Sequence, residues 1–251
     1  LIEAFKLQKN KEKIYVIIDE YDHFANELLG FHPEHFRNLV AKNGKIRKWY
    51  EVLKEGTETV VDRIFITGVA PITLDSLTSG FNISKDISQD VIFNDMMGFT
   101  ENELIEVLNS QELSEEEQTK ILPIMKENYD GYKFNPKASN HIYNSNMSLY
   151  FLAEYVWSRK MPSKLVDVNI ESDYNEIGNM LNLCKREKKL EILRNIVERE
   201  PILADIVAKF NPAIEFNEND MISMLYYLGY LTISGESLGM SELTIPNKVM
   251  T

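Results

Sequence analysis

Cysteine and long apolar runs are scarce in this chain, and their scarcity excludes several classes of protein. The 251 residues include one cysteine, Cys184, so neither a disulfide within the chain nor a zinc site of several thiolates is available. A lone cysteine suits a reducing compartment, and we expect a cytoplasmic protein. No apolar run approaches the roughly 20 residues that a membrane-spanning helix requires, so no membrane association is expected. With 44% hydrophobic and 26% charged residues, the composition is that of an ordinary globular protein.

Positive charge is also in short supply. The chain has 27 Lys and Arg against 39 Asp and Glu, which gives a formal net charge of −12. Because non-specific affinity for nucleic acid comes from neutralising phosphates, this balance disfavours nucleic acid as a partner. The densest basic run, KREKK at 185–189, is followed by Glu191 and Glu198, which indicates a solvated helix face.

The chain also lacks the glycine-rich loop that cradles phosphates in P-loop ATPases. No segment fits G-x-x-x-x-G-K-S/T. The absence matters because Lys13–Tyr21, KIYVIIDEY, has the pattern of the strand that accompanies this loop, the Walker B strand. In such ATPases an Asp at the strand end serves Mg²⁺ and the next residue, a Glu, polarises the attacking water. The pattern predicts part of an ATPase that begins after its phosphate-binding loop.

The Walker B segment carries a structural prediction of its own. Its apolar run, Tyr15–Ile18, favours a strand buried on both faces at the centre of a parallel sheet. Asp19 and Glu20 follow directly, at the C-terminal strand end where open α/β sheets hold ligands. A buried strand followed by a solvated acidic turn is the alternative, since apolar runs ending in Asp-Glu also occur by chance.

A second strand candidate follows at Arg63–Gly68, RIFITG. Between the two strands, Glu34–Glu55 has apolar residues at helical spacing, and Gly44 divides it into two expected helices. Strand, helical crossover and strand form the βαβ unit of parallel sheets. Thr67 stands where ATPases of this class place a polar residue that senses the γ-phosphate, although a Thr before a Gly often simply ends a strand.

Together these segments make the chain recognisable: it resembles the bacterial and archaeal AAA-ATPase-like family. The matching segments are IIDEYD (17–22), TGVAPITLDSLTSGFNIS (67–84), MMGFTENEL (96–104), ENYDGYKF (127–134), YNSNMSLYFL (143–152) and LGYLTI with LTIPNKV (228–249). The resemblance implies a phosphate-binding loop upstream of Leu1 and a restriction-endonuclease-like nuclease domain after Thr251. We therefore expect this chain to be a fragment of a longer protein.

The resemblance also implies a function and its residues. The parent protein is expected to bind and hydrolyse ATP with Mg²⁺. Asp19 would hold the metal through its water shell, Glu20 would orient the attacking water, and Thr67 would contact the γ-phosphate or that water. The chain alone is expected to be inactive as an ATPase and to bind no cofactor. The alternative is a noncatalytic module that binds a protein partner or the parent's other domains.

The expected fold is α/β and has three parts. Residues 1–92 are predicted to hold the C-terminal half of a P-loop ATPase core, 93–212 a mostly α-helical region, and 213–251 a winged-helix-like module. Two capping boxes, Thr100 with Glu103 and Ser114 with Glu117, predict helices that end at Leu108 and Tyr129. Gly131 is expected to supply a positive φ in the turn after the second helix.

The remaining elements are predicted from apolar spacing and from glycine and proline. Helices are expected at Asn146–Trp157, about 173–184, 187–198, 202–208 and Asp220–Leu228, and strands at Tyr230–Ile233 and Glu242–Ile245. Gly229 is expected to stop the last helix. A helix followed by a hairpin suits a winged-helix module. Its segment 214–251 carries five acids and one base, which favours a protein contact over DNA.

Other candidate chemistry is weak. His32 and His35 have the spacing of two metal ligands on one helix face, but no third ligand is evident, and the start of a surface helix is the better interpretation. His23 lies near the Walker B segment without a nucleophile to pair with. The segment YDGYKF, 129–134, is expected to anchor a turn in a core.

Overall fold

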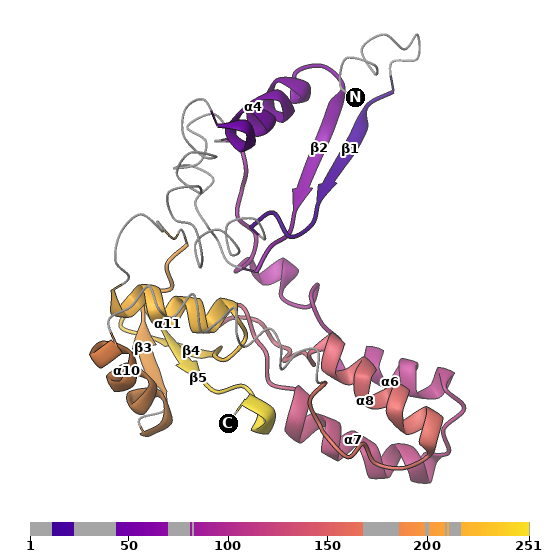
Figure 1. The fold of residues 1–251 in the computed structure, drawn as a ribbon. Coiled ribbons are helices and arrows are strands. Elements are labelled where there is room, and N and C mark those ends of the chain that lie inside the picture. The colour runs from indigo at the N-terminus through magenta and orange to yellow at the C-terminus, as the bar shows by residue number, and fades with distance from the viewer. Residues whose placement is uncertain are drawn as a thin grey trace. The chain divides into compact units, whose positions relative to one another are not determined.

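The protein is described by a computed structural model that covers residues 12–22, 44–69, 81, 83–167, 186–198, 201–208, 210 and 217–250 (Figure 1). It divides into two compact units, each described here by itself. The first unit comprises Leu1–Lys85, Gly178–Leu183 and Val207–Phe216, and the rest of the chain forms the second. Helices accompany a small parallel sheet and a small antiparallel one, so the predicted mixed α/β class is confirmed.

The first unit contains a parallel strand pair with a helix in its crossover. Strand β1, Ile14–Ile18, pairs in parallel with β2, Val61–Ile66, from Tyr15 opposite Arg63 to Ile18 opposite Ile66. Helix α4, Lys45–Thr57, connects them and lies against one face of the pair (Figure 1). The parallel pairing and the second crossover helix are as predicted. The first predicted helix of the crossover lies outside the described residues.

Burial in the strand pair alternates from residue to residue. Val16, Ile18, Ile64 and Ile66 face α4 and pack against a small core of Tyr50, Leu53 and Phe81. On the opposite face, Tyr15 and Ile17 are 70% and 74% exposed. The prediction that Tyr15–Ile18 is buried on both faces is therefore wrong. One helix covers one face, and the described structure places nothing comparable on the other, so an unbroken apolar run coexists here with half-burial.

Three helices form the first part of the second unit. They are α6, Glu101–Ser110, α7, Glu115–Tyr129, and α8, Ser145–Ser158, with a short 3-10 helix, η1, at Val91–Phe93. Both predicted capping boxes are present, and each N-cap hydroxyl accepts a hydrogen bond at 3.3 Å from the backbone N–H three residues later. Their fully buried core includes Leu104, Leu108, Ile121, Met125, Tyr129, Met147 and Phe151.

The YDGYKF segment is a packed turn. Gly131 has φ 104°, and a Cβ there would collide with the carbonyl oxygen of Pro246. Tyr129 and Tyr132 are buried, and the Tyr129 hydroxyl donates to the Leu165 carbonyl at 2.8 Å. The predicted structural role of the segment is therefore confirmed.

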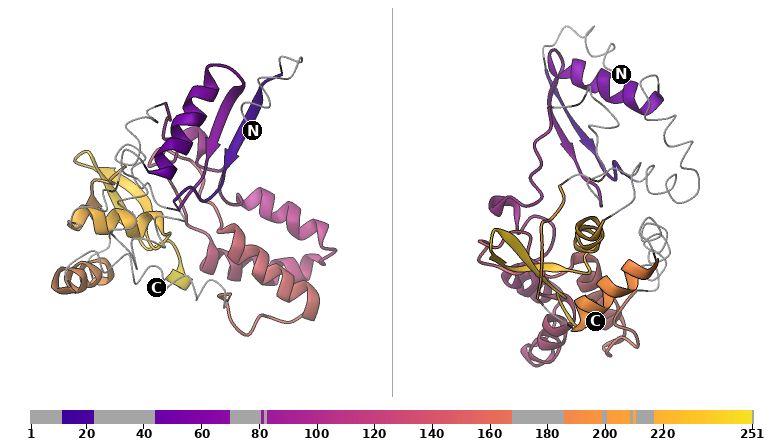
Figure 2. Two further views of the ribbon diagram at one scale, coloured as in Figure 1. Left: turned by 45° about the horizontal axis from the view of Figure 1, so that its top comes forward. Right: turned by 90° about the vertical axis from the view of Figure 1, so that its left-hand side faces the viewer.

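The C-terminal part of the second unit combines two helices with a three-stranded antiparallel sheet (Figures 1 and 2). Its elements are α10, Arg186–Glu198, β3, Ile202–Ala204, α11, Glu218–Tyr227, β4, Thr232–Ser237, β5, Met240–Thr244, and the 3-10 helix η2, Lys248–Met250. The sheet order is β3-β5-β4. The helices predicted at 187–198 and Asp220–Leu228 are confirmed to within two residues. The helix predicted at about 173–184 lies outside the described residues.

Two details of this sheet differ from the prediction. The helix expected at 202–208 is wrong, because Ile202 pairs with Leu243 and Ala204 with Ser241, so a distant strand edge overrides local propensity. Strand β4 runs on to Ser237, and the hairpin turns tightly through Leu238 and Gly239 with φ 54° and 79°. Positive φ at both turn positions matches the right-handed twist of paired strands.

A helix that crosses a membrane must be long and predominantly apolar. Across the part of the chain that the structure describes, no helix has the length and apolar character of a membrane span.

Candidate functional site

The predicted site residues meet at one edge of the parallel strand pair. Asp19 and Glu20 directly follow β1, and Thr67 directly follows β2. The ladder continues beyond the strands, because Thr67 N–H donates to the Ile18 carbonyl at 2.8 Å and Tyr21 N–H donates to the Thr67 carbonyl at 3.0 Å. The prediction that the acidic pair and Thr67 follow adjacent parallel strands is therefore confirmed as a placement.

Thr67 and Asp19 are in direct contact. The Thr67 hydroxyl donates a hydrogen bond to Asp19 Oδ1, across 48 residues of sequence. The same oxygen accepts the Glu20 N–H at 3.1 Å. Both Asp19 and Glu20 are exposed. A hydroxyl and two carboxylates thus share an open edge, which is an arrangement suited to a hydrated cation or a polar ligand.

The backbone of Glu20 is strained. Its φ is 51°, in the left-handed region that non-glycine residues adopt at a cost of about 1–3 kcal/mol. Such conformations persist where the surrounding structure fixes them, and they gather at functional sites. The ladder contacts on either side of Glu20, at Ile18 and Tyr21, hold it in this conformation.

Asp22 belongs to the same edge, and sequence reasoning gave it no role. It is 1% exposed, and its two carboxylate oxygens each lie 3.1 Å from the Val69 N–H. It therefore connects the segment after β1 to the segment after β2. A signal was available: Asp22 and Val69 lie four and three residues beyond strands that were predicted to be parallel neighbours, which places them close together.

The negative charge of Asp22 also affects Tyr50 on α4. The pKa of Tyr50 is raised to about 12, chiefly because the ring is buried, and further because the negative charge of Asp22 opposes tyrosinate formation. Tyr50 packs edge-on against Phe81, with ring centroids 5.1 Å apart. The Asp22 carboxylate is thus close enough to the core of the first unit to act on Tyr50.

The described part of the chain contains no ready-made metal centre. Among the residues that the structure describes, no group of three His, Cys, Asp or Glu side chains is arranged to hold a metal ion. His23, His32, His35 and Cys184 lie outside those residues. Mg²⁺ does not need such a group, because it is commonly held by one or two carboxylates together with substrate phosphates and water.

Comparison with known proteins supports the resemblance for the first part of the chain. A family model described as "Predicted AAA-ATPase" matches residues 1–78. That range contains β1, α4 and β2, and with them Asp19, Glu20 and Thr67. No curated protein and no solved structure matches the chain. Over residues 1–78 the chain is therefore similar to the AAA-ATPase-like family.

Proposed function

We propose that the strand pair carries the Walker B side of a nucleotide site, in a protein that binds and hydrolyses ATP with Mg²⁺. The contact of Thr67 with Asp19 carries this proposal. It joins the two strand ends that a P-loop ATPase uses, within the range that matches the family model. The alternative is an Asp-Glu pair in a solvated turn without a function. That alternative does not predict a hydroxyl from the neighbouring strand end in contact with the Asp.

Each side chain has a stated role in the proposal. Asp19 would hold Mg²⁺ through its water shell, and the residues present fit that ion, because a carboxylate beside a hydroxyl on an open edge provides oxygen ligands. When bound, the ion neutralises charge on the phosphates. Glu20 orients the attacking water, and Thr67 contacts the γ-phosphate or that water. The phosphate-gripping Lys is assigned to a glycine-rich loop elsewhere in a longer protein, because residues 1–251 contain no such loop.

The experiment uses the full-length protein and two substitutions. Glu20→Gln keeps the shape of the side chain but removes its charge, so ATP binding should persist while hydrolysis falls by roughly 10²–10⁴-fold. Asp19→Ala should also weaken Mg²⁺-dependent binding, because it removes the carboxylate beside the ion. Calorimetry and single-turnover hydrolysis separate the two effects. A wild-type rate for Glu20→Gln would make Glu20 a solvated acid and overturn the proposal.

The C-terminal part supports a winged-helix-like module that contacts protein. Helix α11 precedes the β4–β5 hairpin, and β3 extends the sheet. The helix followed by a hairpin is the order proposed from sequence, whereas β3 was not predicted. With five acids and one base in 214–251, the module suits a protein surface better than DNA.

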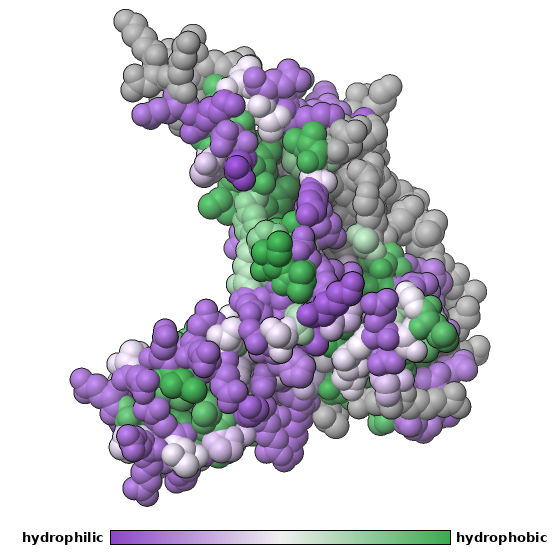
Figure 3. Space-filling model, turned by 180° about the vertical axis from the view of Figure 1, so that it is seen from behind, coloured by the Kyte–Doolittle hydropathy of each residue, from purple (hydrophilic) through white to green (hydrophobic). Residues whose placement is uncertain are grey.

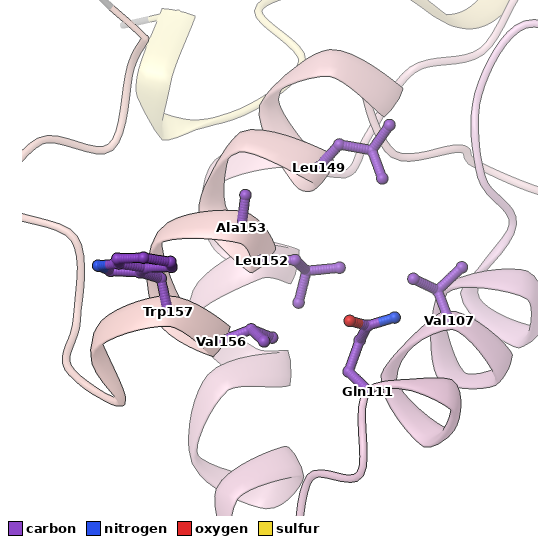
Figure 4. A pocket seen from close by; sticks show the side chains of 7 residues that line it. All are labelled: Val107, Gln111, Leu149, Leu152, Ala153, Val156 and Trp157. Carbon is purple, nitrogen blue, oxygen red and sulfur yellow. The ribbon is translucent and has the colours of Figure 1, made fainter.

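A second candidate function, a noncatalytic interaction module, is favoured by a groove between α6 and α8. The groove measures about 450 Å³, and its lining includes Val107, Leu149, Val156 and Trp157 (Figure 4). Leu149 and Trp157 are 48% and 91% exposed. Seen from behind in Figure 3, apolar residues gather at the lower left among hydrophilic ones. Helix α8 is thus apolar on the groove side as well as on the side that packs into the core. Such a helix is typically buried on both sides.

The charge around this groove indicates what would cover it. Residues 101–117 contain seven Glu and no Lys or Arg. Two of these, Glu101 and Glu117, already pair with Lys126 and Arg159. A positively charged amphipathic helix would complement the apolar lining and the remaining acidic residues of this segment. An 18-residue Leu/Lys helical peptide should bind in calorimetry and change Trp157 fluorescence, whereas a Leu/Glu peptide should do neither. Calorimetric binding that survives Trp157→Ala unchanged would reflect net charge alone and contradict a groove-specific site.

A further inference from the structure

We propose that Asp22 is a positioning residue of this site: it ties the segment after β2 to the segment after β1 and so fixes Thr67 beside Asp19 and Glu20. The inference rests on the proposed function, since it concerns the same edge. It goes beyond the Walker B pattern, which assigns roles to the first two acids only. Asp22 itself faces no reacting atom in this account and acts through Thr67.

The first observation is the burial of its carboxylate. Asp22 is 1% exposed, whereas Asp19 and Glu20, three and two residues earlier, are exposed. Burying a carboxylate is costly unless hydrogen bonds replace its water. Both Asp22 oxygens lie 3.1 Å from the Val69 N–H, so part of this compensation comes from the backbone of the neighbouring loop. Hydrogen bonds to a charged group are roughly twice as strong as neutral ones, which makes this a firm connection.

The second observation is the closeness of the two loops. A Cβ on Gly68 would lie 2.5 Å from Asp22 Oδ1 and 2.5 Å from the Tyr21 ring. Real Cβ atoms do not approach that closely, so a side chain at this position would force the loops apart. Gly68 stands between Thr67 and Val69. Gly68 therefore joins Thr67, which carries the hydroxyl, to Val69, which Asp22 holds. Only glycine is small enough for the loops to approach this closely.

Thr67 is consequently held from two sides. On its N-terminal side, the ladder bond from its own N–H to the Ile18 carbonyl, 2.8 Å, continues the strand pairing. On its C-terminal side, Asp22 holds Val69 two residues later. Because both sides are fixed, the Thr67 hydroxyl is held in position to donate its hydrogen bond to Asp19 Oδ1. Without the Asp22 contact, the second side would keep only the ladder bond from the Tyr21 N–H to the Thr67 carbonyl, 3.0 Å, and Val69 would be released. A displacement of about 1 Å in such a site can lower turnover by about 10²-fold.

The geometric part is testable on residues 1–251 alone, without any ATPase activity. Amide hydrogen exchange of Val69, followed by NMR, should quicken at least tenfold in Asp22→Ala and less in Asp22→Asn, which keeps one acceptor oxygen. Asp62→Asn is the matched control, because Asp62 is an exposed aspartate on β2. If Asp22→Ala does not fold, Asp22→Asn carries the test. An unchanged Val69 exchange rate in both variants would overturn the inference.

The functional part uses the full-length protein and a double-mutant cycle. Asp22→Asn should lower kcat about 10–100-fold while the Kd for Mg-ATP changes less than threefold. Because Asp22 acts through Thr67, the double variant with Thr67→Ala should be no slower than Thr67→Ala alone. Additive losses would overturn the positioning role and leave the ATPase proposal standing. Wild-type turnover in Glu20→Gln would instead overturn the ATPase proposal, while the Val69 exchange result would still decide whether Asp22 ties the loops.

Discussion

The helix starts of the second unit and the strand ends of the first unit are fixed by the same kind of contact over very different sequence separations. At the start of α7, Ser114 and Glu117 cap each other's backbone N–H groups across three residues. After β1, Asp22 accepts the Val69 N–H across 47 residues. A local cap stabilises one helix end. The long-range contact joins two strands, so its loss is expected to disturb the site rather than a single turn.

The largest expected effect contrasts the core of the second unit with the open face of β1. Phe151 is fully buried, and Phe151→Ala should lower the free energy of unfolding by about 3–5 kcal/mol. Ile17 is 74% exposed, and Ile17→Ala should cost less than about 0.5 kcal/mol. Urea unfolding, followed by circular dichroism for the helices and by Trp49 fluorescence in a Trp157→Phe background for the first unit, measures both. A cost above 2 kcal/mol at Ile17 would mean that this face is covered in solution.

A smaller effect is expected at the glycine between the two loops. Gly68→Ala places a Cβ against the buried Asp22 carboxylate and the Tyr21 ring, and overpacking of this kind costs about 1–3 kcal/mol. Gly235→Ala is the control, because its Cβ would first meet Oε2 of Glu242, the mobile end of a side chain. Thermal unfolding of both variants compares them. Equal stability of the two variants would show that the loops separate at no cost.

The smallest effect is expected at a helix cap and depends on pH. Ser114→Ala should cost about 1 kcal/mol at neutral pH. The hydrogen bond from the Ser114 backbone N–H, and then that from its hydroxyl, lower the pKa of Glu117. A lowered folded-state pKa stabilises above the unfolded value, near 4.3, and this stabilisation is lost as the pH falls through the folded value.

The loss of unfolding free energy caused by Ser114→Ala should therefore be smaller in acid than at neutral pH. Denaturant titrations at pH 7 and at pH 3 measure the difference between wild type and variant. Thr100→Ala provides the comparison at the other capping box. A deficit at Ser114 that stays constant from pH 7 to pH 3 would show that the Glu117 carboxylate is not part of the cap.

The range of each contact decided what could be predicted from sequence. The capping boxes and the glycine stops at Gly131 and Gly229 are set by residues within a few positions of each other, and the structure has them where they were expected. Residues 202–204 became a strand because β5, about 40 residues later, offered an edge. Local pattern carried no sign of that pairing.

The features of the candidate site also divide into those set by local sequence and those set by long-range contacts. The positions of Asp19, Glu20 and Thr67 followed from two apolar runs and the rule that parallel strands end at one edge. The burial of Asp22 and the close approach at Gly68 depend on how two loops meet, so they became visible only in the structure. The half-exposure of β1 was missed because an apolar run does not show how many layers cover a sheet.

One measurement tests the central claim most directly: a structure of the full-length protein with Mg²⁺ and a non-hydrolysable ATP analogue. We predict that Asp19 lies in the water shell of the metal. We also predict that the Thr67 hydroxyl lies within hydrogen-bond distance, about 3.2 Å or less, of the γ-phosphate or of a water in line with it. Nucleotide bound away from the C-terminal ends of β1 and β2, with Asp19 and Thr67 contacting only each other, would contradict the account.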